Sequence, residues 1–336
     1  KRETEGAELH LQMGEQNGWG KGQDLEYVVD DEKGRRPDMT SPLLNRNDEA
    51  VRRWGMVNHV VTYDDLPKWR RHNPYIRSGY RVGCESHLAC FRSWFYFHNE
   101  SLNIWSHALG LMTFLAFWGV TYGHTLWANL GEHSGNYIDA LIFAPFMLGA
   151  TTCLLMSTLY HTFEPCGHGI SLGWAKADYV GIGILIWGSY FPVVHYLFYC
   201  RWVIQIIYLS VITALSAAGI VVSVFNRFAN SNLHCYRALL YSSLGLSGLA
   251  PIFHFVLTHD IKGDDLSKIW YLIAMGLFYL TGAAFYATRI PERFFPGSCV
   301  TDMLLSSHFI FHMLIIAGAV CHWMGSVYDL GHIDEC

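Results

Sequence analysis

Seven long apolar runs occupy this chain of 336 residues from about residue 100 onward. A helix that crosses the hydrocarbon core of a bilayer needs about 20 consecutive, mostly apolar residues. Seven such runs are difficult to bury in a soluble protein, whose helices keep one polar face. They predict an all-α fold, a bundle of seven transmembrane helices. The expected spans are roughly residues 101–126, 137–160, 178–199, 202–224, 237–257, 269–288 and 303–323.

Charge is scarce and unevenly distributed. Charged residues make up 15% of the chain, against about 25% in soluble domains, and most of them precede residue 100. We therefore expect a seven-helix membrane domain at 100–325, preceded by a cytosolic juxtamembrane segment at 61–99 and followed by a short lumenal tail at 326–336. Residues 1–60 have few apolar side chains and are expected to be a disordered cytosolic region. No basic stripe indicates a nucleic-acid partner.

The orientation follows from the lysines and arginines that flank the spans, because cytosolic loops are enriched in them. On the side of the N-terminus they are Lys68, Arg70, Arg71, Arg77, Arg81, Arg92, Lys176, Arg227, Arg237, Arg289 and Arg293. On the other side they are Arg201, Lys262 and Lys268. This imbalance predicts a cytosolic N-terminus and a lumenal or extracellular C-terminus, opposite to G-protein-coupled receptors.

Polar residues gather at one depth of the predicted bundle. His161 ends the second span and Asp178 begins the third, while His308 and His312 lie in the first two turns of the seventh. All four belong at the cytosolic face, and Ser157 is one turn before His161 on the same side of its helix. Ionisable groups are costly inside a membrane and usually serve a function there.

This grouping favours a zinc site. His308 and His312 are four residues apart, so both imidazoles can reach one metal ion, and His161 would be the third ligand. Three histidines with an open fourth position are typical of catalytic zinc, which polarises a carbonyl and activates water. Asp178 could then act as the general base, and Ser157 could assist it, in amide or ester hydrolysis. The alternative is that two histidines one turn apart simply pack and form hydrogen bonds.

Other polar residues in the spans admit a structural interpretation. Glu100, Asn103 and His107 share one stripe of the first span, where they either support the site or cap the helix and bond to its neighbours. The histidines outside the cluster are expected to be interfacial or structural. The nine cysteines form no CxxC pair, which indicates neither a disulfide framework nor a cysteine-based zinc site. Those in or beside apolar runs are expected to be packing residues: Cys153, Cys200 and Cys321.

Several motifs, in the same order, resemble those of the progestin and adipoQ receptor family. They are HNESLNIWSHALG at 98–110, Ser157 to His161 with Asp178 following, RIPERFFPG at 289–297 and SSHFIFH at 306–312. The resemblance covers roughly residues 64–325. It implies a seven-helix receptor with zinc near the inner leaflet. It also implies ligand roles for the three histidines and, for Asp178, contact with the metal's water.

The resemblance leaves three functions open. Residues 66–81 and the SVYDL stretch are most similar to the Golgi-resident branch that tethers Raf kinase, so a Golgi protein that restrains Raf signalling is the first. In that case a Raf-type kinase binds the cytosolic N-terminal region. The second is a zinc-dependent amidase acting on a ceramide-like membrane lipid, as attributed to some family members. The third is a receptor for a peptide adipokine or a steroid hormone.

Overall fold

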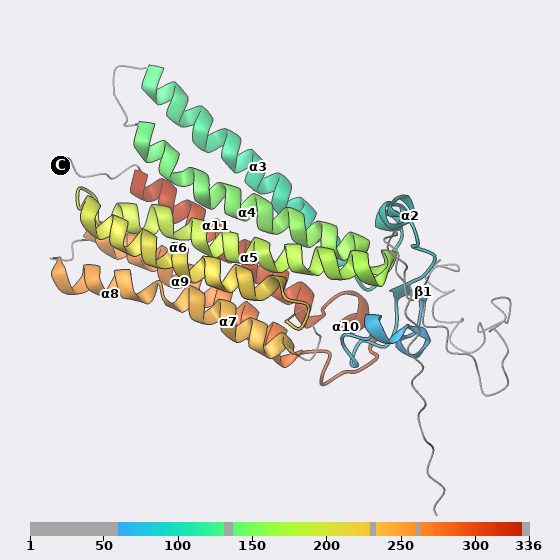
Figure 1. The fold of residues 1–336 in the computed structure, drawn as a ribbon. Helices are drawn as coiled ribbons and strands as arrows, with labels where there is room; N and C mark the ends of the chain where they lie inside the picture. The colour runs from blue at the N-terminus through green and yellow to red at the C-terminus, as the bar shows by residue number, and fades with distance from the viewer. Residues whose placement is uncertain (1–59, 131–136, 229–232, 260–262, 331–336) are drawn as a thin grey trace, which may run out of the picture. The chain divides into compact units, whose positions relative to one another are not determined.

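Seven membrane-spanning lengths of helix run side by side in the computed structural model, which describes residues 60–130, 137–228, 233–259 and 263–330 (Figure 1). The fifth span is split into two helices, and short helices precede the first and the seventh spans, so the helix labels run beyond seven. The long helices are α3 (Ser101–Leu130), α4 (Tyr137–Phe163), α5 (His168–Leu197), α6 (Trp202–Val224), α7 (His234–Leu246), α8 (Leu249–Thr258), α9 (Gly263–Thr288) and α11 (Ser307–Leu330). The prediction of an all-α seven-helix bundle is confirmed.

The outer faces of these helices are apolar. On α6, Val203, Ile206 and Val211 are each at least half exposed, and α3 exposes Leu109 and Met112 in the same way. Soluble monomers do not expose apolar surface on this scale, because water penalises it. Together with the seven spans, these faces make the chain an integral, multi-pass membrane protein.

Small residues allow α4 and α5 to pack closely. A Cβ atom added to Gly188 of α5 would lie 2.2 Å from the carbonyl oxygen of Pro145 in α4, and one added to Gly149 of α4 would lie 2.8 Å from that of Ile184. Where lipid is as apolar as the helices, such close van der Waals contact stabilises helix pairs. These glycines hold in register two helices that carry site residues.

Several helix boundaries differ from the sequence-based expectation, among them those of α5, the fifth span and α11. Helix α5 begins at His168 and not near 178, because its apolar residues Ile170, Leu172 and Trp174 continue the helix towards the N-terminus. The fifth span is broken between α7 and α8, since Pro251 has no N–H to offer the carbonyl of Ser247. Helix α11 extends to Leu330, so the first residues assigned to a tail are helical.

Residues 60–99 fold against one end of the bundle, and we call them the collar. The collar contains β1 (Val60–Val61), η1 (Tyr63–Asp65), η2 (Lys68–Arg70), β2 (Tyr80–Arg81), α2 (His87–Arg92) and η3 (Ser93–Phe95). The two strands pair antiparallel, Val60 with Arg81 and Val61 with Tyr80. The collar lies where α4 ends and α5 and α11 begin, which we call the histidine end. The expected disorder of residues 1–60 falls, except for Val60, outside the described residues.

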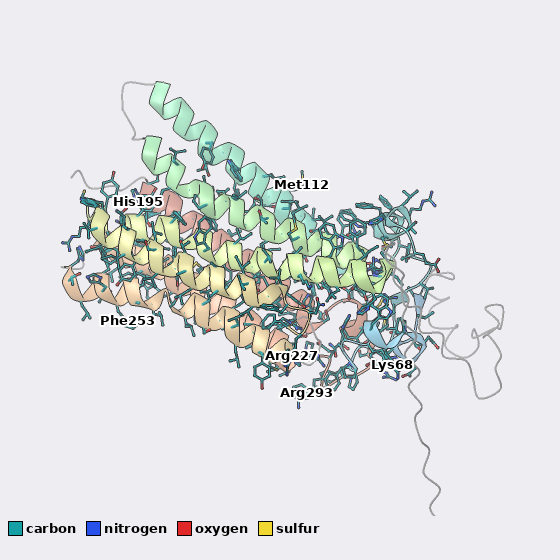
Figure 2. The ribbon with its side chains drawn as sticks, in the orientation of Figure 1. Lys68, Met112, His195, Arg227, Phe253 and Arg293 are labelled. Atoms are coloured by element: carbon teal, nitrogen blue, oxygen red, sulfur yellow. The ribbon has the colours of Figure 1, made fainter. Side chains whose placement is uncertain are left out.

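Basic side chains gather at the histidine end. Figure 2 shows Lys68, Arg227 and Arg293 there, while His195 lies towards the opposite end. The connection from α9 to α11, which contains Arg293, includes the short helix α10 (Cys299–Met303). The charged and apolar parts of the molecule are therefore separated along the bundle axis, as the sequence predicts.

One cysteine does not match its prediction as a packing thiol. Cys153 is buried and Cys321 partly buried, both with free thiols, but Cys200 takes part in a disulfide bond. Cys200 lies three residues after Leu197, the last residue of α5, so its side chain belongs to a loop at the end opposite the histidines and not to a packed helix face.

Candidate metal centre

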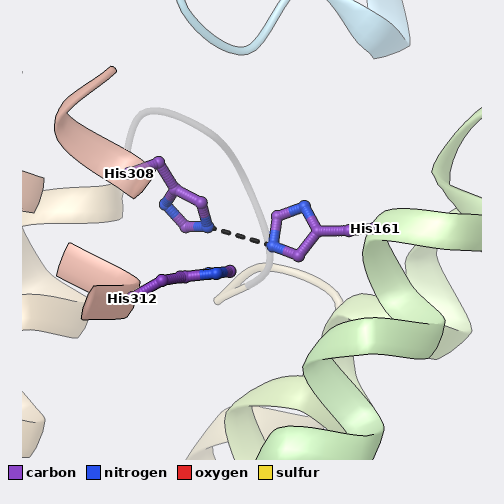
Figure 3. Close-up of side chains that lie close together, drawn as sticks. All are labelled: His161, His308 and His312. Carbon is purple, nitrogen blue, oxygen red and sulfur yellow. Dashed lines mark hydrogen bonds between the residues drawn. The ribbon is translucent and has the colours of Figure 1, made fainter. Parts of the chain in front are cut away.

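Three imidazoles converge inside the histidine end. His161 comes from the last turn of α4, and His308 and His312 come from the first turns of α11 (Figure 3). His161 and His312 are buried and His308 is half-buried. The sequence placed these residues on two helices, and the structure brings them together, with the three rings pointing toward one another.

The spacing of the ring nitrogens suits a metal ion. One nitrogen from each ring lies within 4.8 Å of the other two, and the Nε2 atoms of His161 and His308 are 3.1 Å apart. Zinc with Zn–N bonds of about 2.0–2.1 Å in tetrahedral geometry sets its ligand nitrogens about 3.4 Å apart. Small side-chain adjustments would therefore place all three on one ion, and the site fits zinc or a similar transition metal.

The far nitrogens of two rings are occupied by hydrogen-bond acceptors. The Nδ1 of His161 donates to Oε2 of Glu100 at 2.8 Å. The Nδ1 of His312 is 3.3 Å from the backbone oxygen of Asn103 and 3.3 Å from Oγ of Ser106. With Nδ1 donating, the Nε2 lone pair is free to bind a metal, and ligating histidines in proteins are commonly oriented in this way.

Glu100 is the residue that sequence reasoning undervalued. From the sequence, the stripe of Glu100, Asn103 and His107 either supports the site or caps the helix. Burial alone would raise the pKa of Glu100, but hydrogen bonds from His161 and from Asn103 at 2.7 Å hold it well below its usual range. The carboxylate is thus ionised and able to hold His161 in one tautomer. Its spacing from Asn103 and His107 was the available signal.

His107 completes the surroundings of His312. The two rings stack with centroids 3.6 Å apart and planes 15° apart, and His107 is buried. This stacking restricts the plane of the His312 ring. His107 thus acts on the orientation of a ligand, and the ligand-atom cluster of the described residues does not include it.

Asp178 and Ser157 stand beside the histidines. Both are buried, Asp178 ten residues beyond the start of α5 and Ser157 one turn before His161, and the two side chains interact. Asp178 is not among the ligand atoms that cluster within 4.8 Å. Of the remaining histidines, His254 bonds Tyr208 and His322 packs on Phe146.

A long cavity leads away from this group. Its volume is about 1160 Å³, and its wall includes the three histidines, Ser157 and Asp178 as well as collar residues such as Lys68 and His72. From there it follows α5 past Ile182 and Tyr190 and reaches Ile252 and Val256 of α8. The walls are mostly apolar away from the histidine end. Such a cavity suits a molecule with one polar group and a long hydrocarbon part.

These features define a multi-pass membrane protein with a buried, histidine-based candidate metal site. The chain belongs to the progestin and adipoQ receptor family. Residues 95–323 match the family described as Haemolysin-III related, and relatives of the chain are named as adiponectin receptor or progestin and adipoQ receptor-like proteins. The resemblance noted in the sequence is confirmed at the level of the family, and the Golgi branch remains a prediction.

Named relatives come from distant organisms. The chain is 38% identical to the Drosophila melanogaster protein "Adiponectin receptor protein" over 282 residues, 83% of this chain and 61% of the relative. It is 35% identical to "Progestin and adipoQ receptor-like protein 1" of Caenorhabditis elegans, over 79% of this chain and 60% of the relative. It is 30% identical to "ADIPOR-like receptor IZH2" of Saccharomyces cerevisiae, over 85% of this chain and 89% of the relative. The chain thus spans about three fifths of the length of the first two.

Proposed function

We propose that this chain is a receptor-like membrane protein that binds zinc through His161, His308 and His312 and hydrolyses the amide bond of a ceramide-like lipid. The observation that carries the proposal is the cavity of about 1160 Å³, mostly apolar along α5 and α8, which has the three histidines, Asp178 and Ser157 in its wall. A lipid chain in the apolar part would bring an amide to the polar end.

The chemistry can be written with this chain's own side chains. Asp178 accepts a proton from a water molecule as the water oxygen adds to the amide carbon. Ser157 donates a hydrogen bond to the oxyanion that forms. The C–N bond then breaks, and Asp178 returns the proton to the departing nitrogen. The products are a fatty acid and a sphingoid amine. Zinc, when bound, would polarise the carbonyl and lower the pKa of water to about 7.

The proposal places the histidine end at the inner leaflet. The excess of lysine and arginine at that end supports this orientation. The disulfide bond of Cys200 at the opposite end supports it as well, because disulfides persist in oxidising compartments and not in the cytosol. The reaction would then take place at the depth of the cytosolic headgroups.

The test is hydrolysis by purified, zinc-loaded protein in detergent. Wild type should release sphingosine from ceramide, and Asp178→Asn should lose at least about 100-fold of the rate while retaining its zinc. The matched control is Asp64→Asn in the collar, a carboxylate that pairs with Arg77 at the surface. No release of sphingosine by folded, zinc-loaded wild type would refute the hydrolase and leave the metal site standing.

A second function is supported by the folded collar. Because the collar presents exposed basic side chains such as Lys68 and Arg71, it can be the base of a docking site for a Raf-type kinase at the Golgi membrane. Removing residues 1–59 should abolish co-isolation of the kinase and leave the membrane domain folded. Unchanged co-isolation would count against this function. A peptide adipokine or steroid as the ligand is suggested by the names of the relatives.

A further inference from the structure

Three charged side chains outside the histidine cluster are completely buried: Arg81, Glu292 and Asp302. Arg81 of the collar and Glu292 of the connection after α9 each have 0% exposure. Burying a charge is costly unless excellent hydrogen bonds compensate it. Their partners therefore show what these residues are for.

Arg81 binds the helix end that carries His161. Its Nη2 donates to the backbone oxygen of His161 at 2.6 Å, and its Nη1 donates to that of Thr162 at 3.2 Å. The last carbonyls of a helix have no partner within the helix, and a cation there is favourable. Arg70 fixes Arg81 in turn, since it donates to the oxygen of Arg81 at 2.8 Å and to both carboxylate oxygens of Glu164, each at 2.9 Å.

Glu292 binds the helix start that carries His308. Its Oε2 accepts from the backbone nitrogen of Ser307 at 2.7 Å, and its Oε1 accepts from the Ser307 hydroxyl. Ser307 is the first residue of α11 and directly precedes His308, so Glu292 satisfies an unpaired N–H at a helix N-terminus. The same Oε1 accepts from Asn73 of the collar at 3.0 Å.

The collar therefore binds the backbone beside His161 directly and reaches the backbone beside His308 through Glu292. A second link strengthens its attachment on the side of α11: Oδ2 of buried Asp302, in α10, accepts from the backbone nitrogen and hydroxyl of Ser78 at 2.9 and 2.8 Å. Helices α4 and α11 make few direct contacts with each other, and α11 packs mainly on α9. The collar thus joins the backbone beside His161 to that beside His308, in addition to α3 and α5, which pack on both helices.

We infer that Arg81 and Glu292 are positioning residues of the metal centre, and that the collar sets the spacing of its ligands. The inference rests on the proposed metal site and adds a route for its regulation. Anything that binds or displaces the collar changes the relative position of His161 and His308. By thermodynamic linkage, metal binding must order the collar to the same extent that the collar favours metal binding.

The experiment compares zinc affinity and the visible spectrum of the Co²⁺-substituted protein in wild type, Arg81→Gln and Glu292→Gln. Each variant should bind zinc about 10- to 100-fold more weakly, as for other residues that orient ligands, and should show an altered Co²⁺ absorption band. Arg77→Gln is the matched control. Its side chain belongs to the same collar but pairs with Asp64 at the surface, so affinity and spectrum should be those of wild type.

A third measurement needs no variant and covers the case in which Arg81→Gln does not fold. Loading wild type with zinc should slow backbone hydrogen exchange in residues 70–81, none of which belongs to the ligand cluster. Wild-type affinity and spectrum in folded Glu292→Gln, with collar exchange insensitive to zinc, would overturn the inference and leave the metal site standing. A wild type that binds no stoichiometric metal would overturn the proposed function and this inference together.

Discussion

The Nδ1 of His161 lies 2.8 Å from Oε2 of Glu100, so a carboxylate at the start of α3 orients a ligand at the end of α4. Asn103 donates to the same oxygen at 2.7 Å. The contact joins a third helix to the pair that supplies the imidazoles. It also makes the tautomer of His161 depend on a residue 61 positions away in the chain.

Glu100→Gln should weaken zinc binding about 10- to 100-fold. The amide keeps the size of the side chain but removes the charge that favours an Nδ1–H on His161. Competition with a chromophoric chelator measures the affinity. Glu85→Gln, an exposed carboxylate in the collar, should bind as wild type does, and equal affinities for the two variants would show that the Glu100 contact is unimportant for the metal.

Removing the metal should lower the melting temperature of the protein. A ligand present at 1,000 times its dissociation constant stabilises the state that binds it by about 4 kcal/mol, which corresponds to a shift on the order of 10 °C for a chain of a few hundred residues. Thermal unfolding in detergent, with and without chelator, measures the shift. The melting temperature of His161→Ala should equal that of wild type in chelator and should not change when chelator is added. A chelator effect of equal size in that variant would mean that the metal binds elsewhere.

Gly188→Ala should loosen the α4–α5 pair. The added Cβ would lie 2.2 Å from the carbonyl oxygen of Pro145, and relieving such overpacking typically costs about 1–3 kcal/mol. Thermal unfolding again measures the loss. Gly119→Ala on α3 is the matched control, because a Cβ there meets no atom within 4 Å, and it should not destabilise the protein. Equal melting temperatures of Gly188→Ala and wild type would argue against the close approach of α4 and α5.

Ile252→Trp should narrow the cavity far from the histidines. Ile252 lines the cavity on α8, so a larger side chain excludes long hydrocarbon chains without touching the metal site. We expect slower hydrolysis of long-chain than of short-chain amides, with zinc content unchanged. Val203→Trp, on the lipid-facing side of α6 where Val203 is 50% exposed, should leave the chain-length preference intact. An unchanged preference in Ile252→Trp would place the substrate elsewhere.

The sequence was sufficient to predict the spans and the three converging histidines, because both depend on local patterns. Apolar length identifies a span, and the spacing of His308 and His312 places them on one helix face. The break at Ser247 was missed even though Pro251 is visible in the sequence, since transmembrane helices tolerate internal prolines, as α4 does at Pro145 and α5 at Pro192.

Long-range polar contacts could not be predicted from one sequence. Nothing local to Arg81 indicates that it binds the backbone of His161, 80 residues away, or that Glu292 holds the start of α11. Glu100 was visible on a stripe with Asn103, but its partner lies on another helix, so spacing could not decide between a cap and a contact with a ligand. Such residues are specified by tertiary packing and not by periodicity.

The most direct test of this account is metal analysis of the purified protein beside a variant that carries His308→Ala and His312→Ala. Elemental analysis after extensive dialysis should find about one zinc per wild-type chain, as expected for one three-histidine site. The double variant should retain less than about a tenth of that amount, because one remaining imidazole cannot hold the ion. Equal metal content in the two proteins, or none in well-folded wild type, would contradict the central claim that these histidines form a metal centre.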